Sequence, residues 1–113
     1  MLTIAKLHEL GVDTAEGLNR CMNMEAFYFK MIKMGLANEY FDTLGEKLAQ
    51  NDLPAAFEAA HALKGVIGNL AIAPIYKPLA EITELLRAKQ EADYVSLYAP
   101  VKEFRDKLLA LCD

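Results

Sequence analysis

Apolar residues recur every three or four positions along most of this 113-residue chain, and no segment shows a sustained alternation of apolar and polar residues. A spacing of three and four residues places side chains on one face of an α-helix, whereas alternation is typical of strands. The pattern therefore predicts an all-α fold. Its most economical form is an antiparallel up-down four-helix bundle with one or two short extra helices at the N-terminus.

Capping residues and prolines divide the chain into helical segments. Asp13 and Asp52 are suited to cap helices that begin just after them, and Asn23 is a further candidate. Pro100 is expected to kink the last helix or to split off its first turn. No linker or internal repeat interrupts residues 1–113, which are predicted to form a single domain. The expected helices cover Leu2–Leu10, Thr14–Met22, Met24–Gln50, Leu53–Ile72, a segment that ends at Lys89 after Pro74 and Pro78, and Tyr94–Leu111.

The long segment from Met24 to Gln50 carries methionines and aromatic residues at helical spacing. We interpret them as core packing rather than as the lining of a cofactor site. Val95 is assigned to the core of the last helix on the same grounds. The expected core positions of the long segment are Phe27, Met31, Met34, Ala37, Phe41, Leu44 and Leu48.

Charge and composition argue against several classes of partner. The net charge is −4, and no run of basic residues is present, so neither nucleic acid nor an anionic membrane surface is expected to bind. No stretch approaches 18 uninterrupted apolar residues, and the N-terminus lacks the pattern of a signal peptide. A cytoplasmic location is expected, with Cys21 and Cys112 as reduced thiols.

The motifs of several enzyme classes are missing. Neither GxxxxGK[ST] nor GxGxxG occurs, so no nucleotide-binding loop is expected. There is no HExxH, and His8 and His61 lie far apart in the sequence, which gives a zinc site little support. Ser96 is the only serine, so a Ser-His-Asp arrangement is hard to build. An independent catalyst is not expected.

The segment Ala59–Leu70 gathers an unusual set of residues on one side of an amphipathic helix. Lys64, Gly65 and Gly68 lie three, four and seven residues after His61, and they share its face. Glycine inside a helix costs roughly 0.5–1 kcal/mol relative to alanine, so two on one face need a reason. Clearance for a partner protein is such a reason. The opposite, core-facing stripe contains Ala56, Ala60, Leu63, Ile67 and Leu70.

This face suits a nucleophile. Histidine is mostly uncharged near pH 7, and its neutral imidazole nitrogen is a competent nucleophile. Lys64, one turn further on, could reach a negatively charged group on His61. An isolated exposed histidine is usually just a solvated residue, but the lysine and the two glycines favour a functional role.

Apolar residues along the same line suggest a docking patch for a partner protein. Phe57 precedes His61 by one turn, Ala62 borders it, and Ile72 falls three turns later. The alternative is that the edges of the bundle cover Phe57 and Ile72. Glu58 and Asn69, on the flank, are candidates for contacts at the rim.

The run His61-Ala62-Leu63-Lys64-Gly65, followed by Gly68-Asn69-Leu70, closely resembles the phosphorylation motif of histidine-containing phosphotransfer (HPt) domains. The similarity extends over almost the whole chain. It implies that His61 accepts a phosphoryl group from a receiver-domain aspartate and passes it to another receiver. It also implies that Lys64 stabilises the phosphoryl charge and that Gly65 provides clearance.

The sequence departs modestly from the family pattern. Val66 and Ile67 stand where small residues are common, and Ala71 stands where glycine is frequent. These positions are expected on or near the buried side. They therefore bear on helix packing rather than on the phosphoacceptor.

The resemblance also implies partners. They are response-regulator receiver domains and a hybrid sensor histidine kinase, with Mg²⁺ supplied by the receiver and no cofactor bound by this chain. A monomer is expected, since transfer requires an accessible His61. The alternative is a non-catalytic interaction module, which would bind receiver domains or another helical partner without phosphotransfer.

Overall fold

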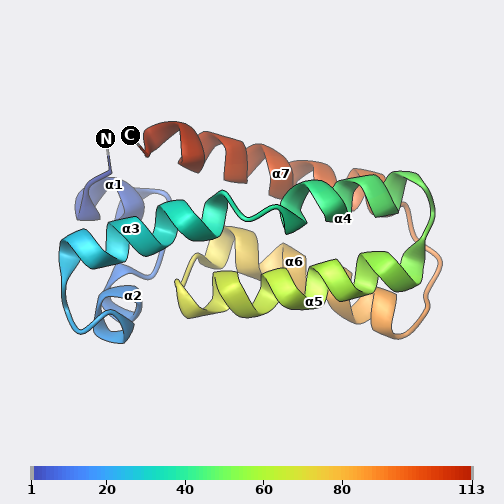
Figure 1. Ribbon diagram of the computed structural model, residues 1–113, viewed down its shortest axis with the longest axis horizontal. Coiled ribbons are helices and arrows are strands. Elements are labelled where there is room, and N and C mark those ends of the chain that lie inside the picture. Colours follow the sequence, from blue (N-terminus) through green and yellow to red (C-terminus); the bar gives the residue numbers. More distant parts are fainter. Residues whose placement is uncertain (1, 113) are drawn as a thin grey trace.

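The computed structural model describes residues 2–112, and within this range it contains helices and no strands (Figure 1). The all-α prediction is confirmed. None of the helices in this range is both long and apolar enough to cross a membrane. The helices are α1 (Ile4–Glu9), α2 (Thr14–Arg20), α3 (Glu25–Leu36), α4 (Tyr40–Ala49), α5 (Leu53–Asn69), α6 (Ala73–Arg87) and α7 (Tyr94–Leu111).

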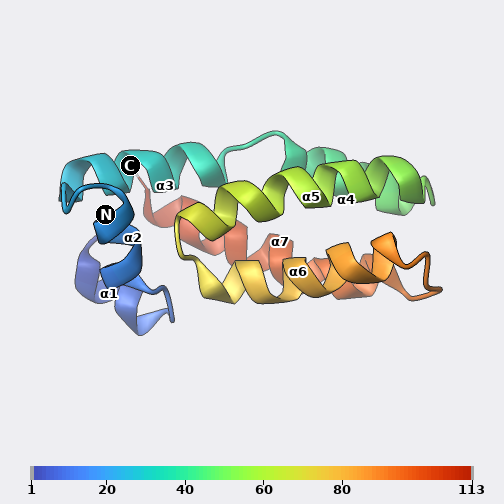
Figure 2. The same cartoon turned by 90° about the horizontal axis from the view of Figure 1, so that it is seen from below.

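Helices α4, α5, α6 and α7 pack together as the predicted antiparallel up-down bundle (Figures 1 and 2). The structure as a whole is elongated, with overall extents of 40 × 23 × 21 Å. Helix α3 continues the direction of α4 beyond the bundle. The short helices α1 and α2 lie at the end where α5 runs into α6 (Figure 1).

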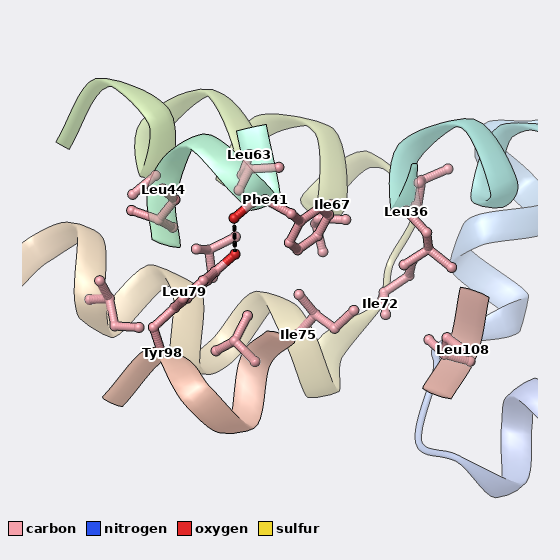
Figure 3. Packing of buried hydrophobic residues seen from close by; sticks show 14 of the residues in the cluster. Leu36, Phe41, Leu44, Leu63, Ile67, Ile72, Ile75, Leu79, Tyr98 and Leu108 are labelled. Carbon is pink, nitrogen blue, oxygen red and sulfur yellow. Dashed lines mark hydrogen bonds between the residues drawn. The ribbon is translucent and has the colours of Figure 1, made fainter. Parts of the chain in front are cut away.

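The core runs along the bundle axis and includes contributions from all four bundle helices, α4 to α7 (Figure 3). A buried hydrogen bond crosses it, because the Tyr98 hydroxyl donates to the Phe41 carbonyl at 2.7 Å and so joins α7 to α4. Removal of the apolar side chains from water is the main stabilising contribution. The residues labelled in Figure 3 are Leu36, Phe41, Leu44, Leu63, Ile67, Ile72, Ile75, Leu79, Tyr98 and Leu108.

Two of the predicted helix caps are confirmed. The Asp13 carboxylate accepts from the Glu16 amide at 3.2 Å, and Asp52 accepts from Ala55 at 3.3 Å. Asn23, the third candidate, is wrong as a cap. It has a left-handed φ of 58°, and its amide donates to the carbonyl of Leu18 at 2.7 Å, so it closes the end of α2. Met24 occupies the N-cap position of α3.

The single long helix predicted for Met24–Gln50 is also wrong. Residues 37–39 interrupt it and separate α3 from α4. The Asn38 side chain accepts from the Tyr40 amide at 2.8 Å. Such a local bond gives the backbone an alternative to the helical ladder, which explains why the helix stops there.

Helix α3 buries a different face from the one predicted. Phe27 and Met34 are exposed, whereas Tyr28, Ile32 and Leu36 are fully buried. In α4 the expected positions Phe41, Leu44 and Leu48 are buried, as predicted.

Neither Pro78 nor Pro100 interrupts a helix, which excludes the split at Pro100, one of its two expected effects. Pro100 lies within α7, which spans Tyr94–Leu111 as one helix rather than losing its first turn. Val95, one residue from the start of this helix, is exposed instead of buried. Pro74 falls in the first turn of α6, where a missing amide hydrogen costs little, and Pro78 lies inside the same helix.

Candidate functional site

Helix α5 carries most of the predicted site residues, and its buried stripe fixes which way they face. Asp52 caps its start, and Pro54 occupies the first turn. The predicted core stripe is confirmed, since every member is at most 5% exposed. His61, on the other side of the helix, is exposed. The buried members are Ala56, Ala60, Leu63, Ile67 and Leu70.

An aromatic ring lies beside the exposed imidazole. The rings of Phe57 and His61 are stacked, with centroids 5.7 Å apart and planes inclined by 20°. The guanidinium carbon of Arg87, on α6, lies 5.0 Å from the centroid of the Phe57 ring. Phe57 is half-buried, so its ring is partly fixed by the protein. The imidazole is therefore held from one side.

Lys64 pairs with a carboxylate on the neighbouring helix. Its Nζ lies 3.7 Å from Oε2 of Glu84. Nε of Arg87 lies 3.3 Å from the other oxygen, Oε1, and donates a hydrogen bond to Oε2 at 3.4 Å. Glu84 thus serves two cations at once, and it links the Lys64 side of the site to the Arg87 side.

The two glycines of the motif have different surroundings. A Cβ built on Gly65 would meet no atom within 4 Å, so the protein leaves open space there. A Cβ on Gly68 would come within 3.0 Å of the Tyr76 ring of α6. Gly65 therefore fits the clearance hypothesis, whereas Gly68 allows α6 to pack closely.

A polar hollow of about 470 Å³ opens beside Lys64 and Gly65. It lies along α5 on the side away from Phe57. Arg20, from α2, supplies a second cationic side chain to its wall. The complete lining is Asp13, Arg20, Lys64, Gly65, Gly68, Asn69, Ala71, Ala73 and Tyr76.

A second, more apolar groove of about 620 Å³ lies on the Phe57 side. Glu58 contributes to this groove, and Asn69 contributes to the polar hollow, so both exposed residues border recesses near His61. Ala62 is half-buried. The groove is lined by Leu53, Pro54, Phe57, Glu58, Leu86, Arg87 and Lys89.

Ile72 does not belong to this surface, and its assignment to the docking patch is wrong. Helix α5 ends at Asn69, and Ala71 takes a left-handed φ of 59° that turns the chain. Ile72 is consequently the N-cap residue of α6 rather than a member of the α5 face. It is fully buried in the core (Figure 3).

Residues from the N-terminal helices hold the C-terminal end of α5. Arg20 donates to the Gly68 carbonyl at 3.4 Å and to Oδ1 of Asn69 at 3.3 Å. The Tyr28 hydroxyl donates to the carbonyl of Leu70 at 3.1 Å. The Asp13 amide donates to the carbonyl of Ala71 at 3.0 Å. They add to the local turn at this end, in which the Ala71 amide donates to the Gly68 carbonyl at 3.1 Å.

Sequence reasoning missed the contributions of Glu84, Arg87, Tyr76 and Arg20. The only local signal was the three-residue spacing of Glu84 and Arg87, which places them on one helix face. Nothing in the sequence indicated that this face of α6 lies against Lys64. The contact depends on how α5 and α6 pack.

The fold and the site define a class of protein: a small helical bundle that presents a histidine, flanked by a lysine and an unobstructed glycine, on the open face of one helix. A family model described as Hpt domain matches residues 35–113, well over half of the chain. The chain therefore belongs to the Hpt domain family, whose members typically transfer phosphoryl groups in phosphorelays. A search of curated proteins and a search of solved structures each found no match.

Proposed function

We propose that this protein is a phosphocarrier in which His61 accepts a phosphoryl group from a receiver-domain aspartate and donates it to a second receiver. The observation that carries the proposal is the exposed His61 imidazole beside the open space left by Gly65. A partner loop can therefore approach the nucleophile without displacing any part of this protein.

The chemistry is an in-line displacement. A neutral imidazole nitrogen of His61 attacks phosphorus, and an N–P bond forms as the P–O bond to the aspartate carboxyl breaks. The carboxylate leaves with the electron pair of that bond. The phosphorylated ring then releases its remaining excess proton to solvent. The reverse sequence transfers the group to the next receiver.

This chain mainly supplies position and charge. Phe57 orients the imidazole, and correct placement of reacting groups contributes strongly to rate. Lys64 stabilises the phosphoryl charge as a point cation. The receiver supplies the acidic pocket and its Mg²⁺. The protein acts as a carrier and not as a kinase, and a hybrid sensor histidine kinase is the proposed upstream source.

The receiver is proposed to dock over His61 and across both recesses. On the apolar side the contacts come from Phe57 and Glu58, and Ala62 lies beside the histidine. On the polar side Gly65, Gly68 and Asn69 meet the partner. The protein acts as a monomer, because a self-associated face would cover His61.

The test is transfer from a labelled, phosphorylated receiver in Mg²⁺ to the wild type, to His61→Gln and to His8→Gln. The last variant is a matched control, because His8 is exposed on α1 and lies outside the site. We expect label on the wild type and on His8→Gln, labile in acid and stable in base, and none on His61→Gln. Circular dichroism verifies that all three proteins are folded.

Equal labelling of His61→Gln would contradict the proposal. If no receiver in a broad panel transfers label, but one binds the wild type and His61→Gln equally well, the protein is an interaction module without phosphotransfer. Absence of both transfer and binding would reject receivers as partners.

A further inference from the structure

The carboxylate of Glu84 pairs with a cation that the proposed phosphocarrier needs for the phosphoryl group. It lies 3.7 Å from Nζ of Lys64, the cation expected to meet the phosphoryl group. The side chain of Lys64 is 26% exposed and that of Glu84 is 58% exposed. Exposed pairs of this kind are weak, so Lys64 can leave Glu84 for a stronger anion.

A phosphoryl group on His61 is such an anion. It adds a charge of about −1.5 to −2 and three strong acceptor oxygens. Lys64 lies one turn from His61 on the same face, so the phosphoryl group and Glu84 compete for one ammonium group. The cost of separating Lys64 from Glu84 raises the free energy of the phosphorylated state.

Arg87 keeps Glu84 in place during this competition. Its Nε lies 3.3 Å from Oε1 of Glu84, and its guanidinium lies over the Phe57 ring. Phe57 is in turn stacked on His61. When Lys64 turns toward a phosphoryl group, the carboxylate therefore keeps a cationic partner and stays beside the site.

We infer that Glu84 is a positioning residue that sets the phosphotransfer equilibrium through its pairing with Lys64. It makes phosphorylated His61 a better phosphoryl donor and unphosphorylated His61 a poorer acceptor. The inference rests on the proposed function of His61. The inference goes beyond that function because it assigns the balance between phosphoryl acceptance and donation to a carboxylate on α6.

The test measures the equilibrium ratio of phosphorylated carrier to phosphorylated receiver, starting from a labelled receiver. For Glu84→Gln we expect this ratio to rise by roughly three- to fivefold, equivalent to about 0.7–1 kcal/mol and typical of an exposed ion pair. Glu81→Gln is the matched control, because it removes the same charge from an exposed position one turn earlier on α6. It should leave the ratio within twofold of the wild type.

A double-mutant cycle separates this effect from a general change in structure. If Glu84 acts through Lys64, Glu84→Gln should have little effect in a Lys64→Ala background. Glu84→Asp keeps the charge, so its ratio of phosphorylated carrier to phosphorylated receiver should lie between those of the wild type and Glu84→Gln. The inference is overturned if Glu84→Gln matches Glu81→Gln, or if its full effect persists without Lys64.

The same measurement distinguishes this failure from failure of the proposed function. If the wild type takes label on His61 and the equilibrium ratio is the same for Glu84→Gln, only the role of Glu84 is rejected. Wild-type protein that takes no label from receivers, or from phosphoramidate monitored by ³¹P NMR, removes the phosphocarrier function and the role of Glu84 with it.

Discussion

The ring of Phe57 stacks on the imidazole of His61, with centroids 5.7 Å apart, and the two side chains are one turn apart on α5. Phe57 is also in contact with Arg87 of α6. The imidazole thus stacks on a ring that belongs to α5 and also contacts α6.

Replacement of this ring should slow phosphotransfer more than it affects the fold. Phe57→Leu keeps an apolar side chain but removes the stacking, and aromatic pairs contribute about 0.5–1.5 kcal/mol. We expect the transfer rate from a receiver to fall by about two- to tenfold, measured by rapid-quench kinetics. Phe104→Leu, which changes a half-buried ring on α7, is the control and should leave the rate unchanged. Equal rates for Phe57→Leu and the wild type would count against an orienting role.

Gly65→Ala should separate stability from function. The added methyl group meets no atom of the protein within 4 Å, and alanine favours a helix over glycine by about 0.5–1 kcal/mol. Urea denaturation should therefore show a more stable protein. Transfer should fall by roughly ten- to a hundredfold, because the methyl group displaces the approaching partner and small misplacements are costly.

Gly45→Ala is the control for this experiment. Gly45 lies on α4, and its added methyl group would make an ordinary contact with the Tyr98 ring, 3.5 Å from Cε2. It should gain stability without losing transfer. If Gly65→Ala transferred as fast as Gly45→Ala, Gly65 would not provide clearance for the partner.

Ala71→Gly should stabilise the protein. Ala71 has a φ of 59°, a left-handed conformation that costs an ordinary L-residue about 1–2 kcal/mol and glycine very little. After allowance for the greater freedom of glycine in the unfolded chain, we expect a gain of about 1 kcal/mol in the free energy of unfolding. Ala80→Gly, inside α6, should instead lower the free energy of unfolding by about 1 kcal/mol. A loss at both positions would refute the strain at Ala71.

Stability should fall at high pH because of a buried tyrosine. Burial raises the pKa of Tyr28 to about 12, whereas an unfolded tyrosine ionises near pH 10. The unfolded chain therefore loses its proton first, so this contribution to stability is complete below pH 10 and is lost as the pH rises from 10 to 12. Urea denaturation across this range should show a smaller loss for Tyr28→Phe than for the wild type. Tyr40→Phe, at an exposed position, should behave like the wild type.

The bundle was predictable where each helix has a single apolar face and a clear start. Helix α5 illustrates this, since Asp52 caps it and its apolar stripe is buried as expected. Helix α3 carries apolar residues on two faces. Phe27 and Met34 lie on one, and Tyr28 and Ile32 on the other, so spacing alone could not decide which face enters the core. The Tyr28 hydrogen bond to Leu70 shows which face packs against the bundle.

The candidate site was predictable only along a single helix. The spacing of His61, Lys64 and Gly65 follows directly from helix geometry. The pairing of Lys64 with Glu84 joins positions 20 residues apart, and it exists only once α6 has packed against α5. The expected position of Ile72 on the α5 face is wrong because α5 ends at Asn69, three residues before Ile72.

The hydrogen bonds at the end of α5 also determine how this domain can be transplanted. The carbonyls of Gly68, Leu70 and Ala71 are served by Arg20, Tyr28 and Asp13, which all precede the family match at residue 35. A graft of residues 35–113 into another protein would carry the histidine without the groups that secure its helix. A transferable cassette has to begin before Asp13.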